Sequence, residues 1–200
     1  MYAVRFHGRG GQGAKTASRI LGTAAFLSGY QAQDSPIYGA ERRGAPVAAF
    51  TRFGREPIRE RGVIAHPDLV VVADASLLEA PAARVSDGIT DQTILFVNAP
   101  LHAEQIRTQS GLPGRITTFG VTEIALQHFG QREAISALLG AVAARLSGLQ
   151  QEPLRQAIAR ELEDLGVAPP IIERNQTVAL TCYESAQVIE RESVAESATI

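Results

Sequence analysis

Hydrophobic and polar positions in the first 28 residues predict a strand followed by a helix. Residues 2–7 alternate in character around Val4 and Phe6, which is typical of a strand with two different faces. From residue 14 onward, apolar side chains recur three and four positions apart, as on one face of an amphipathic helix. Four glycines fall within the six residues that separate the two segments. The order is therefore strand, glycine turn and helix.

Further strands are predicted by short apolar runs between turn-forming residues. They occupy residues 30–33, 47–53, 68–73, 93–97 and 116–119, with another extended segment around Ile58. The runs at 68–73 and 93–97 are continuous, as expected of parallel strands that are covered on both faces. Asp74 or Ser76 is expected to cap a short helix after the first of these runs. Residues 34–46 contain two prolines and two glycines, so we expect an irregular loop there.

The last third of the chain reads as helical. Apolar stripes with helical spacing cover residues 135–146, 154–162 and 171–189, and Pro153 is placed at a helix start. Beyond Glu190 the chain is polar, and we expect a mobile tail over residues 191–200. The fold class that follows is α/β: a Rossmann-like, largely parallel sheet flanked by helices, with a helical C-terminal third. Residues 1–190 are expected to form a single domain.

Composition narrows the classes of function. The formal net charge is −2 over 200 residues, which argues against non-specific binding of nucleic acid. Cys182 is the one cysteine, so neither an intramolecular disulfide nor a cysteine-ligated iron–sulfur cluster can form within the chain. The four histidines lack metal-ligand spacing, and no apolar run is long enough for membrane insertion. A cytoplasmic protein without a metal site of its own is expected.

The glycine turn is the first candidate binding site. A turn between a strand and a helix aims unpaired N–H groups and the positive end of the helix dipole at its occupant, which favours an anion. Lys15, in the first helical turn, could reach a phosphate. With Asp34 after the second strand, the glycines also match the dinucleotide fingerprint, so a stand-alone NAD-binding oxidoreductase is an alternative. A second alternative is that the glycine turn merely links the strand to the helix and binds nothing. The candidate residues are Gly8, Arg9, Gly10, Gly11, Gln12, Gly13 and Lys15.

The loop over residues 34–46 is the second candidate. Arg42 and Arg43 are adjacent there and could hold a phosphate or a partner's carboxylates with paired hydrogen bonds. An exposed, solvated charge cluster is the alternative interpretation. Elsewhere, Ser35, Ser76 and Cys182 lack the local setting of a nucleophile. We therefore assign no catalytic residue and expect this chain to bind, with the bond-breaking chemistry located elsewhere.

Two segments carry a resemblance to a known family. Residues 6–13 read FHGRGGQG, and residues 38–46 and 49–53 read YGAERRGAP and AFTRF. Together they resemble the gamma subunit of 2-oxoacid:ferredoxin oxidoreductases, most of all the pyruvate:ferredoxin oxidoreductase branch. The resemblance is most specific over residues 1–75 and continues more loosely into the helical third.

The resemblance implies a multi-subunit enzyme that oxidatively decarboxylates a 2-oxo acid with coenzyme A. The products are an acyl-CoA, carbon dioxide and reduced ferredoxin or another acceptor. Thiamine diphosphate supplies the electron sink and would lie with Mg²⁺ on alpha and beta subunits. The [4Fe-4S] clusters would lie on beta and on a ferredoxin-like delta subunit. Pyruvate is the favoured substrate, and aromatic (phenylglyoxylate-like), branched-chain and 2-oxoglutarate substrates remain alternatives.

Residue by residue, the resemblance implies that the glycine turn faces the coenzyme A pyrophosphate or an adjoining subunit. Lys15 would lie nearby, and Arg42, Arg43 and Gly44 would meet phosphates or a neighbouring chain. A purely structural assembly subunit, whose turn packs on a partner, remains an alternative. The residues implied at the partner interface are Tyr38, Glu41 and Pro46.

Overall fold

The computed structural model of the chain describes residues 1–36, 44–131 and 135–197. Within these residues a six-stranded sheet has the order β2-β3-β1-β4-β5-β6. β1 pairs in parallel with β4, β4 with β5 and β5 with β6, which confirms the expected parallel sheet on that side. The strands are β1 (Tyr2–Arg9), β2 (Gln31–Pro36), β3 (Pro46–Gly54), β4 (Leu69–Val72), β5 (Ile94–Asn98) and β6 (Arg115–Phe119).

β3 is antiparallel to both of its neighbours, β1 and β2. It therefore separates the first two strands, which a dinucleotide-binding unit would place side by side. β2 also continues to Pro36, so the expected loop starting at residue 34 is wrong by three residues. Asp34 lies within this strand, opposite Thr51 of β3, and not beyond the strand's end. Its side chain is exposed on the strand at the margin of the sheet.

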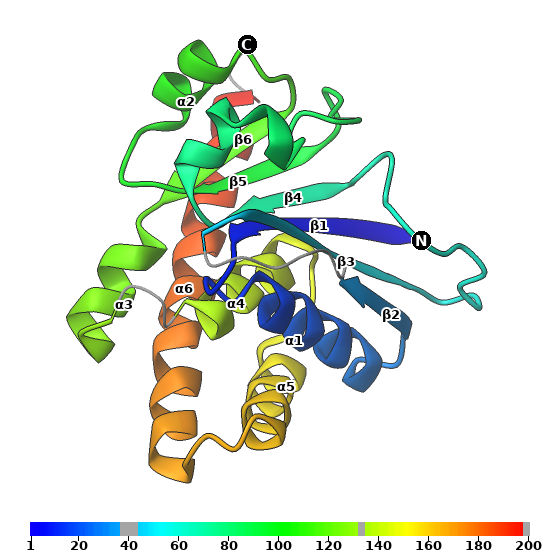
Figure 1. Cartoon of the computed structure of the whole chain (residues 1–200), viewed down its shortest axis with the longest axis vertical. Helices are drawn as coiled ribbons and strands as arrows, with labels where there is room; N and C mark the ends of the chain where they lie inside the picture. The colour runs from blue at the N-terminus through cyan, green and yellow to red at the C-terminus, as the bar shows by residue number, and fades with distance from the viewer. Residues whose placement is uncertain (37–43, 132–134, 198–200) are drawn as a thin grey trace.

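Helices cover the two faces of the sheet unequally (Figure 1). One face carries a thick apolar layer in which Phe6, Leu21, Leu139 and Ile158 are buried together. The other carries one short α-helix and two 3₁₀ helices. The thick layer contains α1 (Ala14–Leu27), α3 (Val121–Phe129), α4 (Ser136–Leu146), α5 (Gln151–Asp164) and α6 (Pro169–Ser197), and the thin layer contains α2 (Ala103–Ser110), η1 (Ala75–Glu79) and η2 (Pro81–Ala83).

The structure confirms some predicted helices and corrects others. α1, α4 and α5 lie where the apolar stripes place them, and Asp74 caps η1 by accepting from the Ser76 backbone N–H. α6 begins at Pro169 and continues to Ser197, past the expected end at residue 189. The helix thus enters the range expected to be a tail, whose mobility stays a prediction. Residues 55–68 contain no helix or strand, so the expected extended segment around Ile58 does not pair into the sheet.

β1 divides the molecule because its alternate residues face opposite layers. Val4 and Phe6 join the thick apolar layer, whereas Arg5 and His7 are buried on the other face. Arg5 donates hydrogen bonds to the carbonyls of Val85 and Asp87, at 2.8 and 2.6 Å. Burial lowers the pKa of His7 to about 3, and the charge of Arg5 acts in the same direction. The strand that leads into the glycine turn is therefore fixed on both faces.

Candidate functional site

The glycine turn lies at the edge of the sheet where the parallel strands end. β1 runs into the turn at Arg9, β4 is followed by Asp74, and β5 ends at Asn98. In open α/β sheets, ligands bind outside the carboxyl ends of the strands, where successive connections leave in opposite directions. Here β1 lies between β3 on one side and β4 on the other. We refer to the turn (residues 8–13), Asp74, Ser76 and Asn98 as the carboxyl edge.

Backbone hydrogen bonds join the turn to the beginning of β3. The Gly10 N–H donates to the Ala45 carbonyl at 2.8 Å, and the Gly44 N–H donates to the Gly10 carbonyl at 3.2 Å. Within the turn, the Gln12 N–H donates to the Arg9 carbonyl at 2.9 Å. These hydrogen bonds bring the end of the loop that carries the second candidate site against the first candidate site. Two segments more than thirty positions apart therefore share one surface.

Gly11 presents bare backbone at the tip of the turn. It is exposed, its φ is +98°, and a Cβ built there would meet no atom within 4 Å. A positive φ of this size is costly for residues other than glycine. The position therefore combines a conformation that requires glycine with open space in front of it. Another molecule can approach the main chain closely at this point.

Gly13 serves a different purpose, because it lets two helices meet. It precedes α1 with φ +75°, and a Cβ there would lie 2.7 Å from the Cβ of Ser136 at the start of α4. Real Cβ atoms do not approach so closely, so only glycine permits this packing. The N-termini of α1 and α4 consequently lie together beside the turn. The positive ends of the α1 and α4 helix dipoles therefore both lie beside the glycine turn.

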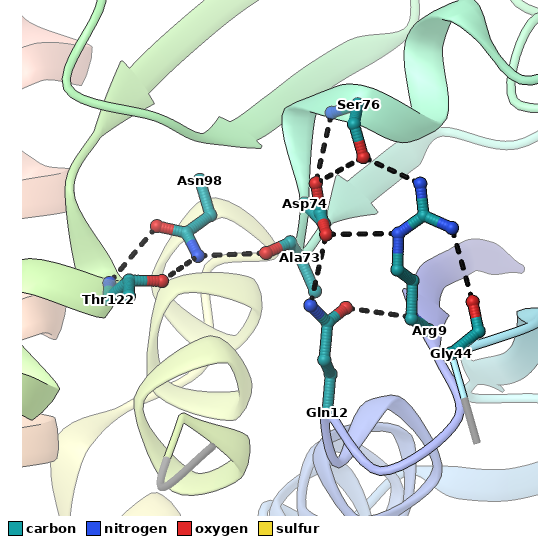
Figure 2. A network of polar contacts seen from close by, with 8 residues as sticks. All are labelled: Arg9, Gln12, Gly44, Ala73, Asp74, Ser76, Asn98 and Thr122. Atoms are coloured by element: carbon teal, nitrogen blue, oxygen red, sulfur yellow. Dashed lines mark hydrogen bonds and ion pairs between the residues drawn. The ribbon is translucent and has the colours of Figure 1, made fainter. Parts of the chain in front are cut away.

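Polar side chains hold the turn to the end of β4 (Figure 2). Arg9 Nε and Gln12 Nε2 both donate to Asp74 Oδ2, at 3.2 and 3.1 Å. Gln12 Oε1 accepts from the Arg9 backbone N–H at 2.7 Å, so the Gln12 side chain connects the end of β1 to the Asp74 carboxylate. Arg9 also donates to the Gly44 carbonyl at 3.1 Å and to Ser76 Oγ at 2.7 Å. The Arg9 side chain thereby contacts two other segments of the chain, residues 74–76 and the residues just before β3.

Asn98 makes the corresponding connection further along the sheet. Its Nδ2 donates to the Ala73 carbonyl at 2.9 Å and to Thr122 Oγ1 at 2.8 Å. Its Oδ1 accepts from the Thr122 backbone N–H at 3.2 Å, which caps the first turn of α3 (Figure 2). Asn98 is buried, so these contacts satisfy an amide that would otherwise be costly to bury. They tie β4, β5 and α3 into one edge.

The structure places the expected site residues unevenly. Residues 8–13 and Gly44 lie together, and Lys15 lies half-buried in the first turn of α1. Pro46 begins β3, next to Arg9 in the register. The side chains of Arg9 and Gln12 bond to Asp74, a contact that the sequence did not indicate. Their ligand contacts stay a prediction. The remaining expected residues lie outside the described part of the chain: Tyr38, Glu41, Arg42 and Arg43.

The chemistry available at this edge is that of an anion site. The backbone at Gly11 is exposed and the N-termini of α1 and α4 lie beside the turn, an arrangement that suits phosphate groups. Among the described residues, no three His, Cys, Asp or Glu side chains gather as they would around a metal ion. Cys182 is buried, and burial raises the pKa of its thiol to about 12. No helix in the described ranges has the length and apolar character to cross a bilayer.

Comparisons with known proteins agree with one another. The family model described as pyruvate ferredoxin/flavodoxin oxidoreductase matches residues 3–185. The chain is 42% identical over 192 residues to a Pyrococcus furiosus protein named pyruvate/ketoisovalerate oxidoreductases common subunit gamma, covering 95% of this chain and 100% of that one. The crystal structure of pyruvate oxidoreductase subunit PORC from Thermotoga maritima matches with a TM-score of 0.76 and 34% identity, over 92% of this chain and 95% of that one.

A more distant structure shows the same fold inside a longer chain. It is the 2-oxoglutarate:ferredoxin oxidoreductase from Magnetococcus marinus, solved with 2-oxoglutarate, coenzyme A and succinyl-CoA bound. The TM-score is 0.69 at 13% identity, over 96% of this chain and 31% of that one. At this identity the likeness concerns the fold alone.

Proposed function

This chain belongs to the pyruvate ferredoxin/flavodoxin oxidoreductase family as a gamma subunit, and we propose that its glycine turn forms part of a coenzyme A site completed by partner subunits. Coenzyme A carries a diphosphate and a 3′-phosphate, and helix N-termini with bare backbone suit such groups. A protein of the same fold was solved with coenzyme A bound, which motivates this choice of ligand. The role of this chain is to bind and orient.

The assembled enzyme, in this proposal, converts a 2-oxo acid and coenzyme A to an acyl-CoA and carbon dioxide, and reduces ferredoxin or another acceptor. Pyruvate is the favoured substrate because both relatives described above carry it in their names, although one of these names also includes ketoisovalerate, a branched-chain alternative. Thiamine diphosphate, Mg²⁺ and the [4Fe-4S] clusters belong to alpha, beta and delta partner subunits. The single, buried Cys182 supports that division, since a cluster needs several thiolates.

The open backbone at Gly11 is the observation that carries the coenzyme A proposal. Gly29 also has open backbone at a positive φ, but the turn at Gly11 has in addition the N-termini of α1 and α4 beside it, which a mere link between strand and helix does not need. Lys15 lies in the first turn of α1, directly after the glycine turn, and would add positive charge near a phosphate. Arg42 and Arg43 directly precede Gly44, which bonds to the turn, so we propose that they contact coenzyme A or a neighbouring subunit.

The structure argues against the stand-alone NAD-binding alternative, because Asp34 does not lie where a dinucleotide site needs its acidic residue. A dinucleotide site needs a carboxylate at the end of the strand adjacent to the turn, where it binds the ribose. β3 occupies that place, and Asp34 lies on β2, one strand further away. Neighbouring strands are about 4.8 Å apart, so β3, lying between β1 and β2, places Asp34 about that much further from the turn than a ribose-binding carboxylate would lie.

Substitution of Gly11 in the assembled complex tests the proposal. The Cβ of Gly11→Ala would occupy the space assigned to the ligand, so we expect the KM for coenzyme A to rise about tenfold or more. The KM for the 2-oxo acid should change less than twofold. Gly29→Ala is the matched control, because Gly29 is also exposed, has φ +86° and has nothing within 4 Å of a built Cβ. It follows α1 at the opposite end from the turn.

The control separates backbone strain from a blocked ligand. Equal effects of Gly11→Ala and Gly29→Ala on the KM for coenzyme A would contradict the proposed site. If Gly11→Ala prevented assembly and Gly29→Ala did not, or if the Gly11→Ala complex assembled with an unchanged KM for coenzyme A, the purely structural subunit would be the better account. Co-purification of the partner subunits, checked for each variant, distinguishes these results.

A further inference from the structure

We propose that Asp74 is a positioning residue that sets the affinity for coenzyme A without touching it. It would do so by fixing the shape of the glycine turn through Arg9 and Gln12. The inference rests on the proposed coenzyme A site and adds to it a specific residue from a distant part of the chain. Asp74 follows β4 and lies 62 positions from Gln12 and 65 from Arg9 in the sequence.

The two carboxylate oxygens of Asp74 have separate partners. Oδ1 accepts from the Ser76 backbone N–H at 3.0 Å and from Ser76 Oγ at 2.6 Å, which caps η1. Oδ2 accepts from Arg9 Nε and Gln12 Nε2. A helix cap accounts for the first oxygen alone. The second oxygen has no role in η1, and its donors both belong to the turn.

Four donors occupy the carboxylate, which has about four acceptor positions in all. Burial acts to raise the pKa of Asp74, but the hydrogen bonds from Ser76 and Gln12 and the charge of Arg9 outweigh it and lower the pKa. The group is therefore ionised near neutral pH and fully engaged within the chain. That arrangement suits a fixed support and leaves no free lone pair for a metal ion or a reacting proton.

Arg9 extends the influence of Asp74 to the second candidate loop. With Nε on Asp74, its other two nitrogens reach Ser76 Oγ and the Gly44 carbonyl. The guanidinium is planar and its donors are fixed relative to one another, so orienting one N–H orients the rest. Loss of the Asp74 contact would free the arginine and loosen Gly44 together with Gly10, which bond to each other. Both sides of the proposed phosphate site would shift.

Asp74→Asn separates the two functions of the side chain. An amide keeps one oxygen, which can still accept from Ser76 and cap η1. Its NH₂ group replaces Oδ2 and cannot accept from Arg9 or Gln12. In the assembled complex we expect the KM for coenzyme A to rise about tenfold, with kcat at saturating coenzyme A changed less than twofold.

Gln12→Glu provides a rescue that a merely destabilising effect would not show. Alone, it places a second carboxylate beside Asp74, and we expect it also to raise the KM for coenzyme A. Combined with Asp74→Asn, the new carboxylate can accept from the asparagine NH₂ and restores the charge beside Arg9. We expect the double variant to recover most of the lost affinity. Asp87→Asn is the control, because Asp87 forms an exposed ion pair with Arg84 away from the turn.

The outcomes distinguish this inference from the proposed function. If Gly11→Ala raises the KM for coenzyme A and Asp74→Asn does not, the turn binds coenzyme A and Asp74 is not its support. If neither variant changes that KM, the proposed site itself is wrong. A fall in kcat without a change in the KM for coenzyme A would also overturn the positioning role. Additive effects of Gln12→Glu and Asp74→Asn, with no recovery, would contradict the coupling.

Discussion

The thick helical layer and the carboxyl edge are stabilised by different interactions. In the helical layer, Leu138, Leu139 and Val142 of α4 are fully buried with side chains from α1 and the sheet. At the carboxyl edge, a few hydrogen bonds between distant residues fix a turn with exposed glycine backbone. Apolar burial is non-directional and tolerates small shifts, whereas hydrogen bonds define positions. Substitutions in the helical layer should change stability alone, whereas substitutions in the glycine turn and at Asp74 should change ligand binding.

Deleting a buried side chain of the helical layer should have the largest effect. Leu139 has no exposed surface, and Leu139→Ala leaves a cavity, so we expect the free energy of unfolding to fall by about 2–5 kcal/mol. Urea unfolding of the purified chain measures this loss. Leu165→Ala is the control, since 55% of the surface of Leu165 is exposed, and it should change stability by less than about 0.5 kcal/mol. An altered KM for coenzyme A in the folded Leu139→Ala complex would contradict the division between the regions.

The next largest effect is a pH dependence that comes from His7, at the junction of the two regions. Burial holds the pKa of His7 at about 3, against 6.5 for an unperturbed histidine. The folded state therefore binds fewer protons than the unfolded state between these values, so stability rises with pH across that window. Because of His7, the free energy of unfolding should fall by about 1.4 kcal/mol for each pH unit as the pH is lowered from 6.5 toward 3.

His7→Gln tests this contribution, because glutamine has no proton to gain. Urea unfolding of both chains at intervals from pH 4 to 7 should give a smaller pH slope for the variant, whatever its absolute stability. Identical slopes would mean that His7 binds a proton equally well in the folded and unfolded states, which would contradict the lowered pKa.

A smaller loss of stability is expected from Asn98, within the carboxyl edge. Asn98→Ala removes hydrogen bonds to Ala73 and Thr122 and leaves the Ala73 carbonyl without this partner. We expect a cost of about 1–3 kcal/mol, measured by denaturant unfolding. Asn175→Ala removes a bond from Asn175 to the Ile171 carbonyl of its own helix and should cost about 0.5 kcal/mol or less. Equal losses of stability in the two variants would show that hydrogen bonds between elements at the carboxyl edge stabilise the fold no more than a bond within one helix.

The sequence predicts what depends on local periodicity. The strand, glycine turn and helix at the amino terminus, the buried strands β4 and β5, and α4 and α5 all follow from apolar spacing and lie as expected. Asp74, one of the two residues expected to cap a short helix, is the cap of η1. These features depend on neighbours within a few residues, so a single sequence contains the information.

Features that depend on distant contacts were missed. α3 is nine residues long, and its first turn is capped by Asn98 from another strand, so no local signal marks its start. The insertion of β3 between β1 and β2 cannot be read from strand order along the chain, and it removes Asp34 from the fingerprint. The second role of Asp74 depends on donors more than sixty residues away. Its one local signal is an acidic residue directly after a buried strand.

Hydrogen–deuterium exchange of the assembled complex, with and without coenzyme A, tests the central claim most directly. We expect coenzyme A to slow exchange in peptides that cover residues 10–16, where the turn meets the first N–H groups of α1, and to leave the segment around Gly29 unchanged. Protection of partner-subunit peptides by coenzyme A, with no change at residues 10–16, would contradict the account.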